Sequence, residues 1–439
     1  MYDTLPEPLP FKQRRALMPM WGQAPLPEVR WPATWQSLQE QPLPHGSLAY
    51  VHIPFCANHC VFCGFYRNGW KAETASRYVD RLIAEIEHDA ATRQKSGSVS
   101  ALYLGGGTPT LLSARDLGRL LQALRANLPL SDDCEITVEG RISHFGEDKV
   151  DACIKAGANR FSIGVQTFAT HIRRRLGRKH PGDEAARYLE WLAAHSGQVV
   201  VADLMFGLPG QDDSVWRQDL ATALSLGLSG VDVYAFNLMP QLPIVRMIEK
   251  GALPSAGSLA EQLAQYRTAC RAFDEAGWAQ LSNSHFGAPC ARERNRYNLA
   301  IKAGADCLAF GSGAGGKRGA FSYAVEPDLE RYLACPVSQK PIARLGRGDA
   351  AGQLAALQGA VETGRIALAS LPEPAQTRPL IERWAALGLL TLGHDHAELT
   401  VDGRFWGPTM IREMAERIAP AGAGHAHPLT LHHPLKETA

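Results

Sequence analysis

The segment Tyr50-Val-His-Ile-Pro-Phe-Cys-Ala-Asn-His-Cys-Val-Phe-Cys-Gly-Phe-Tyr66 decides the fold, because it joins a strand-like run to three closely spaced cysteines. Cys56, Cys60 and Cys63 follow the spacing C-x3-C-x2-C. Three thiolates can hold three irons of a four-iron cluster, which leaves the fourth iron open to a small molecule. The pattern therefore predicts a [4Fe–4S] centre with one open corner, and these cysteines are its candidate metal ligands and catalytic residues.

A structural zinc site with His59 as the fourth ligand is the alternative interpretation. Zinc sites usually combine two pairs of ligands that are separated by a dozen or more residues. Here all candidate ligands fall within residues 56–63, and His59 and Cys60 are adjacent, so both could hardly reach one tetrahedral ion. The spacing therefore favours the cluster.

The composition is that of an ordinary globular protein. The chain has 439 residues, of which 45% are hydrophobic and 20% charged, enough for two or three domains. The net charge of +1 gives no indication of nucleic acid or an anionic membrane as partner. No apolar run approaches the roughly 20 residues of a membrane span, and we see no signal peptide. Of the nine cysteines, the six outside the triplet are scattered singly among apolar neighbours, which suits a reducing compartment, so we expect a cytoplasmic protein.

Short apolar segments alternate with amphipathic ones from residue 48 onward, which predicts parallel strands with helices outside. The expected fold class is α/β, a partial parallel β/α barrel followed by an α+β extension and a small C-terminal module. The predicted strands are 48–53, 101–104, 135–138, 160–165, 199–206 and 230–236. The predicted helices between them are 77–93, 114–126, 147–156 and 213–225.

The chain divides into five expected parts. Residues 1–45, rich in proline and tryptophan, form an extended arm, and residues 46–255 form the β/α core. Residues 256–340 form an extension that completes the active site, with a strand at 280–285 and a linker at 337–347. Residues 341–420 form a helical module that resembles a winged helix, with two short strands at 388–392 and 397–404. Residues 421–439 are expected to be a disordered tail.

Polar motifs follow the ends of the predicted strands, where a β/α barrel places its active site. Leu104-Gly-Gly-Gly-Thr-Pro-Thr110 lets the backbone approach a ligand closely, although a simple turn is the alternative. Glu139 ends the third strand and Gln166 the fourth, and Arg178 follows twelve residues later. Asp203 lies within an apolar strand, where an acid needs a partner such as a ribose hydroxyl or a structural donor.

These motifs occur in one order, and together they resemble the radical S-adenosylmethionine (SAM) superfamily. YVHIPFC, GGGTPT, RFSIGVQTF, LGR and DLMFGLPGQ are similar to the coproporphyrinogen III oxidase-like subfamily over about residues 47–320. The resemblance implies that the open iron binds SAM and that one electron cleaves it to methionine and a 5′-deoxyadenosyl radical. The cofactor contacts that it implies are Tyr50, Gly106, Gly107, Thr108, Glu139, Gln166, Arg178, Asp203 and Met205.

Departures from the subfamily indicate the branch. Phe65 stands where the coproporphyrinogen oxidases carry a further cysteine, and residues 294–298 lack the His and Trp of the haem-chaperone motif. Segments 63–67, 138–141, 158–162 and 308–316 instead resemble the haem-utilisation radical SAM methyltransferases, the HutW/ChuW or anaerobilin synthase group.

That resemblance implies oxygen-independent haem degradation for iron acquisition. The enzyme would open the haem macrocycle to a linear methylated tetrapyrrole and release iron. Its implied partners are haem as substrate, a flavodoxin-like electron donor, a haem-delivery protein and a downstream tetrapyrrole reductase. Arg67 and Arg141 are candidates for the haem propionates, and His285 and Tyr297 for the haem iron. The alternatives are a coproporphyrinogen III oxidase and a non-catalytic haem-binding chaperone.

Two further motifs in the sequence are weaker indications of function. Gly311–Lys317 nearly fits a P-loop, but Arg318 stands where Ser or Thr must hold magnesium, which argues against it. The basic run from Arg173 to His180 could meet propionates or could be a solvated helix face.

Overall fold

The computed structural model describes residues 8–16, 23–93, 96–289, 292–348 and 351–418, and a thirteen-stranded mixed sheet forms their core. The middle of this sheet is parallel. Its strands, in spatial order, are β12 (Cys307–Phe310), β2 (Ser47–Ile53), β5 (Val99–Gly106), β6 (Leu130–Gly140), β7 (Arg160–Gln166), β8 (Val199–Phe206) and β9 (Gly230–Ala235). The predicted strands of the β/α core are therefore confirmed, and β12 adds a parallel strand on the far side of β2.

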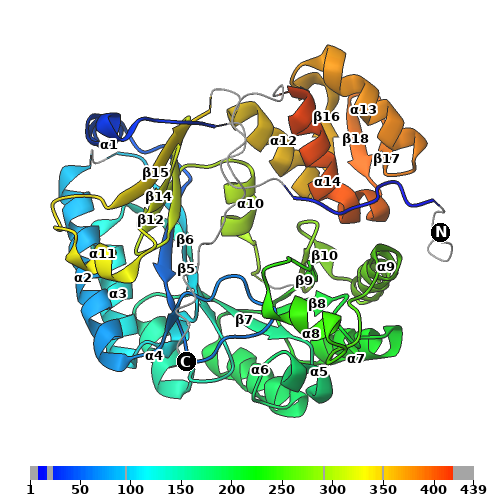
Figure 1. Ribbon diagram of the computed structural model, residues 1–439, viewed down its shortest axis with the longest axis horizontal. Coiled ribbons are helices and arrows are strands. Elements are labelled where there is room, and N and C mark those ends of the chain that lie inside the picture. Colours follow the sequence, from blue (N-terminus) through cyan, green and yellow to red (C-terminus); the bar gives the residue numbers. More distant parts are fainter. Residues whose placement is uncertain (1–7, 17–22, 94–95, 290–291, 349–350, 419–439) are drawn as a thin grey trace.

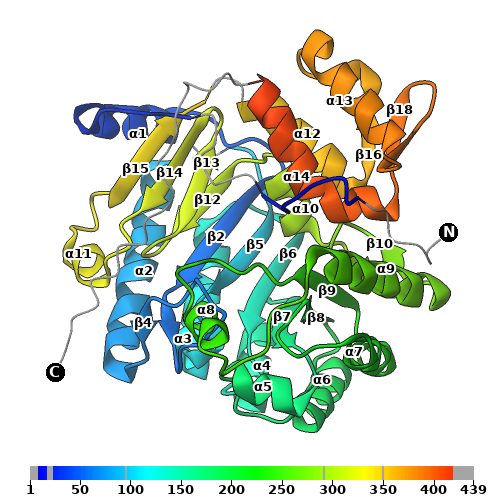
Figure 2. The same cartoon turned by 45° about the vertical axis from the view of Figure 1, so that its right-hand side comes forward.

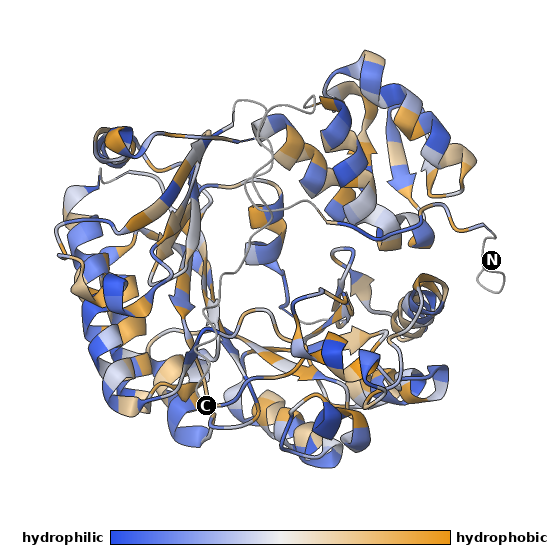
Figure 3. Ribbon diagram, viewed as in Figure 1, coloured by the Kyte–Doolittle hydropathy of each residue, from blue (hydrophilic) through white to orange (hydrophobic). Residues whose placement is uncertain are grey.

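Helices cover the outer side of the curled sheet (Figures 1 and 2). They carry both hydrophobic and hydrophilic residues, as expected when one helix face packs on the sheet (Figure 3). The outer helices are α2 (Ala72–Thr92), α3 (Ala114–Asn127), α4 (Glu147–Lys155), α5 (Thr170–Arg175), α6 (Gly182–Ser196) and α7 (Asp213–Ser225). Ser113 and Asp212 cap α3 and α7 by accepting from backbone N–H groups, which fixes where these helices begin.

Antiparallel strands extend the sheet at both edges. One edge consists of β13 (Gly315–Arg318), β14 (Phe321–Val325), β15 (Ile342–Arg347) and β1 (Ala24–Pro25), and the other of β11 (His285–Gly287) and β10 (Ala279–Gln280). The expected linker at 337–347 was wrong, because β15 pairs with β14 along its length. The expected strand at 280–285 was also wrong: β10 and β11 form a hairpin around the residues between them.

Two small strands, one long helix and several short helices complete the core. Two small strands, β3 (Phe55–Cys56) and β4 (Asn68–Gly69), bracket the cysteine loop. The remaining elements are η2 (Pro109–Leu111), α8 (Pro243–Glu249), α9 (Leu259–Glu275), α10 (Arg296–Lys302) and α11 (Leu329–Ala334). The glycine-rich segment after β12 is the turn into β13, and a strand rather than a helix follows it, so no P-loop is formed.

The N-terminal arm is only partly extended, contrary to expectation. A helical turn η1 (Glu28–Arg30) leads into helix α1 (Trp31–Glu40), whose Trp35 packs on Tyr323 of the large sheet. The described residues 8–16 form neither helix nor strand and lie across helix α14 (Val401–Ile418) of the C-terminal module (Figure 2). Tertiary packing of the tryptophans thus organises a segment that its prolines suggested would stay extended.

The C-terminal module combines helices with a small antiparallel sheet of β16 (Arg365–Ala367), β18 (His396–Leu399) and β17 (Leu390–Leu392). Its other elements are α12 (Ala351–Thr363), η3 (Leu368–Ser370), α13 (Pro374–Ala386) and α14. The expected strand at 397–404 was too long, because Val401 already begins α14. The winged-helix resemblance stays a prediction, and the tail at 421–439 lies outside the described residues. None of the described helices is long and apolar enough to cross a membrane.

Candidate active site

A chamber lies inside the curled parallel sheet. Side chains on a strand alternate between its two faces, so every second residue of each parallel strand points into this chamber. The register aligns Glu139 with Ser162 and Asp203 with Asp232 on neighbouring strands. The residues that point inward include Tyr50, His52, Tyr103, Glu139, Ser162, Asp203, Met205, Asp232 and Tyr234. Several of the predicted site residues therefore line one chamber.

Helix α10 closes the chamber where the parallel strands begin. The backbone N–H groups of Arg296 and Tyr297 donate to the Glu135 carboxylate, which anchors the first turn of α10 to β6. The Tyr297 ring packs 4.9 Å from that of Tyr103 and 6.4 Å from that of Tyr50. Tyr297 thus belongs to an aromatic floor, and its hydroxyl lies 3.9 Å from the Cys307 sulfur.

The three cysteines lie at the other end of the chamber, on β3 and the loop that follows β2. Cys56 and Cys60 are buried and Cys63 is half-buried. Several N–H and O–H donors point at their sulfurs. The Thr108 hydroxyl lies 3.6 Å from Cys56 Sγ, and the Phe65 backbone N–H lies 3.3 Å from Cys63 Sγ. Hydrogen bonds of this kind to ligand sulfurs tune iron–sulfur clusters.

Arg141 joins two of these sulfurs. Its guanidinium places Nη1 3.5 Å from Cys60 Sγ and Nη2 3.7 Å from Cys56 Sγ. Burial raises the pKa of the Cys56 thiol, and Arg141 opposes that shift by favouring the thiolate. The structure thus brings the predicted propionate partner Arg141 directly to the candidate cluster ligands.

The spacing of the sulfurs fits a cluster better than a single ion. A tetrahedral zinc site, with Zn–S bonds of about 2.3 Å, holds its sulfurs roughly 3.8 Å apart. In the part of the chain that the structure describes, the only three Cys, His, Asp or Glu donors within 4.8 Å of one another belong to Glu147, Asp151 and His195. The sulfurs of Cys56, Cys60 and Cys63 thus do not all lie within 4.8 Å of one another, whereas one tetrahedral zinc ion would hold them closer.

The glycines of the GGGTPT motif are required by close contacts. Gly106 has φ +116°, and a Cβ there would lie 2.7 Å from Cε1 of His52. A Cβ on Gly107 would lie 2.4 Å from the Phe55 carbonyl oxygen and 3.0 Å from Cys56 Sγ. The loop is thus pressed against the cysteine strand, with its backbone exposed to the chamber.

Two acids in the chamber have unusual proton affinities. Burial, followed by repulsion from Asp203, raises the pKa of Glu139 to about 8. Burial, followed by repulsion from Asp232, raises the pKa of Asp203 to about 7. Glu139 accepts from the Gly106 N–H at 3.3 Å, and Asp203 accepts from the Ser162 hydroxyl at 3.1 Å. These carboxyl groups are poised to ionise when a cation enters.

The side chains of Gln166 and Arg178 lie close together beside Gly164, and each has a polar atom without a hydrogen-bond partner. A Cβ on Gly164 would lie 3.1 Å from Gln166 Nε2 and 3.6 Å from Arg178 Nη2. Gln166 has a positive φ of 68° at a register shift in β7, which is costly for a residue other than glycine. Gln166 Oε1 and Arg178 Nε are buried without a hydrogen-bond partner. Unpartnered buried atoms in a strained site indicate a missing polar ligand, and SAM fits this requirement.

Of the remaining predicted residues, some lie beside the chamber and others are buried in the protein interior. Tyr50 contacts His52 through a 3.0 Å hydrogen bond, and burial followed by the nearby Arg67 lowers the pKa of His52 to about 4. Arg67 therefore lies beside both the chamber and Cys63. Arg173, from the basic run, is 1% exposed and donates to the backbone oxygens of His180, Val165 and Thr167. Arg173 thus has a structural role.

His285 lies in a buried ionic cluster that the sequence did not reveal. Its ring nitrogens lie 3.1 Å from an Asp232 oxygen and 3.4 Å from a Glu293 oxygen, and Arg160 pairs with Glu293 at 3.0 Å. The two carboxylates outweigh burial and raise the pKa of His285 to about 9. Each ring nitrogen of His285 faces a carboxylate oxygen without the geometry of a hydrogen bond, and its role as an iron ligand stays a prediction. Asp232, within an apolar strand, carried the same sequence signal as Asp203.

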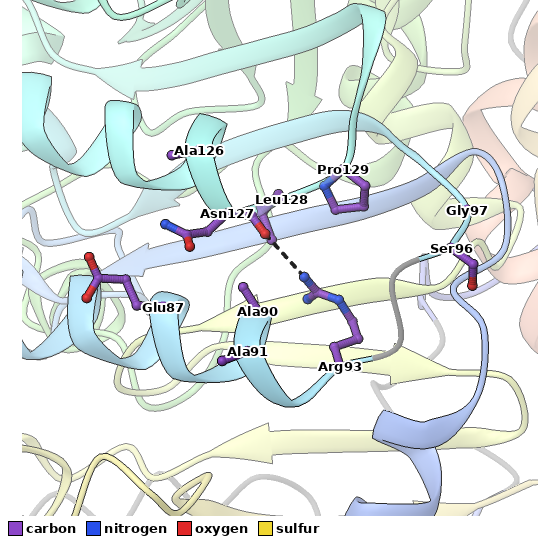
Figure 4. Close-up of a pocket in the computed structure, with 10 residues that line it drawn as sticks. All are labelled: Glu87, Ala90, Ala91, Arg93, Ser96, Gly97, Ala126, Asn127, Leu128 and Pro129. Carbon is purple, nitrogen blue, oxygen red and sulfur yellow. Dashed lines mark hydrogen bonds between the residues drawn. The ribbon is translucent and has the colours of Figure 1, made fainter.

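A cavity away from the chamber lacks comparable chemistry. A cavity of about 490 Å³ lies between the ends of α2 and α3 (Figure 4). Its one cation, Arg93, is already engaged by Asp89 at 2.6 Å and by the Asn127 carbonyl at 3.4 Å. None of the predicted site residues lines it.

Comparison with known proteins agrees with this site. Residues 50–223 match the radical SAM superfamily. The chain is 43% identical to the anaerobilin synthase of Escherichia coli O157:H7 over 415 residues, which is 93% of each chain. It is 33% identical to the heme chaperone HemW of Escherichia coli (strain K12) over 272 residues, 61% of this chain and 69% of that relative.

The fold also matches a solved structure. The coproporphyrinogen III oxidase (HemN) of Escherichia coli superposes with a TM-score of 0.76 and 22% sequence identity, over 93% of this chain and 97% of that chain. This match confirms the partial barrel with its extension. The chain therefore belongs to the radical SAM superfamily, in the haem-utilisation (HutW/ChuW, anaerobilin synthase) branch of the coproporphyrinogen III oxidase-like subfamily, and uses a [4Fe–4S] cluster and SAM.

Proposed function

We propose that this protein degrades haem without oxygen, as a radical SAM methyltransferase that opens the macrocycle to a linear methylated tetrapyrrole and releases iron. The observation that carries the proposal is the 43% identity to an anaerobilin synthase over 93% of both chains. More distant relatives, a heme chaperone and a coproporphyrinogen III oxidase, cover 61% and 55% of the chain. The near full-length match thus favours haem degradation over both alternatives.

The geometry supports a division of labour among the chamber residues. Cys56, Cys60 and Cys63 would hold the cluster, and bound SAM would supply a carbon-centred radical and a methyl group. Gln166 and Arg178 offer an unpartnered acceptor and donor to the amino-acid end of SAM. Glu139 and Asp203 would receive its ammonium and ribose groups.

The rest of the cofactor wall would come from the residues that the resemblance assigns. Tyr50 and Met205 face the chamber, and Gly106, Gly107 and Thr108 form the wall next to Cys56.

Apolar side chains at the mouth of the chamber suit a flat macrocycle. Phe65 is 70% exposed, Leu238 46%, Tyr234 41% and Met239 39%. A Cβ on Gly64 would lie 3.2 Å from Met239 Cε, so the cysteine loop and the segment after β9 meet there. Phe65 occupies the position of the oxidases' further cysteine, which favours an apolar contact with substrate. Arg67 stays our candidate for a propionate.

We further propose a cytoplasmic location and a flavodoxin-like electron donor, with a haem-delivery protein and a tetrapyrrole reductase acting before and after the enzyme. The eight cysteines that the structure describes are all free thiols, which supports a reducing compartment.

The decisive experiment is anaerobic incubation of the reconstituted enzyme with haem, SAM and a reductant. We expect mass spectrometry to show a ring-opened tetrapyrrole that has gained a methyl group, with iron recovered by a chelator. Cys60→Ala should lose the cluster absorption and all SAM cleavage. An unchanged haem mass, with deoxyadenosine formed, would count against degradation.

Parallel reactions test the alternatives. Decarboxylation of coproporphyrinogen III would indicate an oxidase. Stoichiometric haem binding without deoxyadenosine formation would indicate a chaperone.

A further inference from the structure

A cationic pocket opens beside the cysteine cluster, apart from the apolar mouth. Its volume is about 190 Å³, and loops next to α4, α5 and α6 supply most of its lining. These helices lie side by side in both ribbon views (Figures 1 and 2). The charged or titratable side chains that line it are Arg141, His144, Arg173, Arg178, Lys179 and His180. No carboxylate lines this pocket among the residues that the structure describes.

Cations are concentrated in this pocket, although Arg173 and Arg178 donate to backbone carbonyl oxygens. Neither Lys179 nor Arg141 has a carboxylate within ion-pair distance in the described part of the chain. His180 is the exception, because it lies 2.7 Å from Glu184. Lys149 adds a further cation behind the wall, where its amino group donates to the His144 carbonyl at 2.8 Å. The whole chain carries a net charge of only +1, so this density of cations is local.

The wall of the pocket reaches the cluster ligands directly. Arg141 donates to the sulfurs of Cys56 and Cys60, as described above. Asn58, also in the lining, places Nδ2 3.8 Å from Cys60 Sγ and 2.9 Å from the Gly177 carbonyl oxygen. A molecule bound at this pocket is therefore separated from the sulfurs of Cys56 and Cys60 only by the Arg141 side chain.

The size of the pocket argues against a tetrapyrrole as occupant. Ligand sites for compounds of that size are usually about 300–1,000 Å³, and this pocket is smaller. Its cations, the exposed Lys179 among them, instead suit a shallow contact with acidic groups on another protein. Redox encounters use small interfaces and depend on charge complementarity for their rate.

We propose that this pocket is the docking surface for the acidic face of a one-electron carrier protein. The proposal rests on the proposed function only in that SAM cleavage needs one electron from outside. In the docked pair the carrier loses one electron and the cluster gains it, and no bond or proton is exchanged. Lys179 steers the carrier, and Arg141 and Asn58 lie between the carrier and the sulfurs.

The test is stopped-flow reduction of the reconstituted holoenzyme with SAM bound and no tetrapyrrole present. Reduced flavodoxin is the protein probe, and reduced methyl viologen, a small cation, is the control reductant. Lys179→Glu should slow reduction by flavodoxin about tenfold at low salt, since steering accelerates association by roughly 10- to 1,000-fold. The rate at which methyl viologen reduces the cluster of Lys179→Glu should not fall. Added salt should slow the wild type more than the variant.

Lys155→Glu is the matched control, because it makes the same charge change on an exposed residue at the opposite end of α4. Flavodoxin should reduce the cluster of this control variant at the wild-type rate. Equal flavodoxin rates for Lys179→Glu and wild type, or an equal loss in Lys155→Glu, would overturn the proposal. So would weaker haem binding by Lys179→Glu with unchanged flavodoxin reduction, because the pocket would then serve propionates. Normal cluster reduction with no haem turnover would contradict only the proposed function.

Discussion

Arg141 shows how one side chain can set the redox behaviour of the site. Its guanidinium lies 3.5 and 3.7 Å from two ligand sulfurs, and no carboxylate in the described part of the chain neutralises it. A nearby positive charge favours the state that carries one more electron. Arg141 should therefore make the cluster easier to reduce.

Replacing Arg141 by glutamine should lower the reduction potential of the cluster. We expect a shift on the order of 60 mV, about tenfold in a one-electron equilibrium. Arg141→Lys keeps the charge and should retain most of the wild-type potential. Potentiometric titration followed by electron paramagnetic resonance measures both variants, and a wild-type potential in Arg141→Gln would refute this role.

Glu139 and Asp203 should make SAM binding depend on pH. Their pKa values of about 8 and about 7 leave them largely protonated in slightly acidic solution. A bound cation favours the carboxylates, so binding should release protons and the affinity for SAM should increase from pH 6 to 8. Calorimetry in buffers of different ionisation enthalpy counts those protons. Glu139→Gln should flatten the dependence, whereas a flat profile in the wild type would contradict the assignment.

At the scale of elements, buried ion pairs join strands that are distant in sequence. Arg160 begins β7, Asp232 lies in β9, His285 begins β11 and Glu293 lies in the following loop. Removing one member of a buried pair leaves the other uncompensated, which typically costs about 3–5 kcal/mol. This cluster therefore fastens the antiparallel hairpin of β10 and β11 to the parallel sheet.

Glu293→Gln should lower the free energy of unfolding by about 3–5 kcal/mol, measured by denaturant titration of tryptophan fluorescence. Stability should also depend on pH through His285. Its pKa is raised from 6.5 to about 9 by Asp232 and Glu293, so its contribution is complete below pH 6.5 and is lost as pH rises to 9. His285→Gln should remove that loss; an equally steep profile in the variant would assign it elsewhere.

The sequence predicted the parallel elements well because their signal is local. Strand β8 was predicted with its observed bounds, since a buried parallel strand is a continuous apolar run between turn residues. The edge strands were not predicted, because β15 and β10 depend on partners rather than on their own pattern. The same holds for the site. The cysteines and the glycine loop are contiguous motifs, whereas the contacts of Arg141 and Glu293 arise only in three dimensions.

At the scale of the whole molecule, the N-terminal segment holds the C-terminal module in place. Arg14 donates to the Phe405 carbonyl at 2.9 Å, and its guanidinium lies 5.2 Å from the Phe405 ring centre. The rings of Phe11 and Trp406 lie 5.4 Å apart. On the core side, Arg267 of α9 pairs with Asp402 of α14 at 2.6 Å. The C-terminal module thus contacts α9 on one side and residues 8–16 on the other.

Phe11→Ala should weaken the contact between residues 8–16 and α14 without affecting the β/α core. An aromatic pair contributes about 0.5–1.5 kcal/mol beyond the area that it buries. We therefore expect roughly a tenfold loss of hydrogen-exchange protection in α14, measured by mass spectrometry, with unchanged protection in β2 and β5. Leu387→Ala, an exposed apolar residue 44% accessible to solvent, is the control. Unchanged exchange in α14 would show that the segment only rests on the module.

The position of residues 8–16 on α14 has a consequence for biosynthesis. Residues 8–16 are made well before their binding surface, which is complete only after residue 409, since the Arg15 backbone N–H donates to the Thr409 hydroxyl. The strands that surround the cysteine loop are complete long before that point. The parallel strands around the cysteine loop can therefore fold on the unfinished chain, and the packing of residues 8–16 on α14 completes the tertiary structure last.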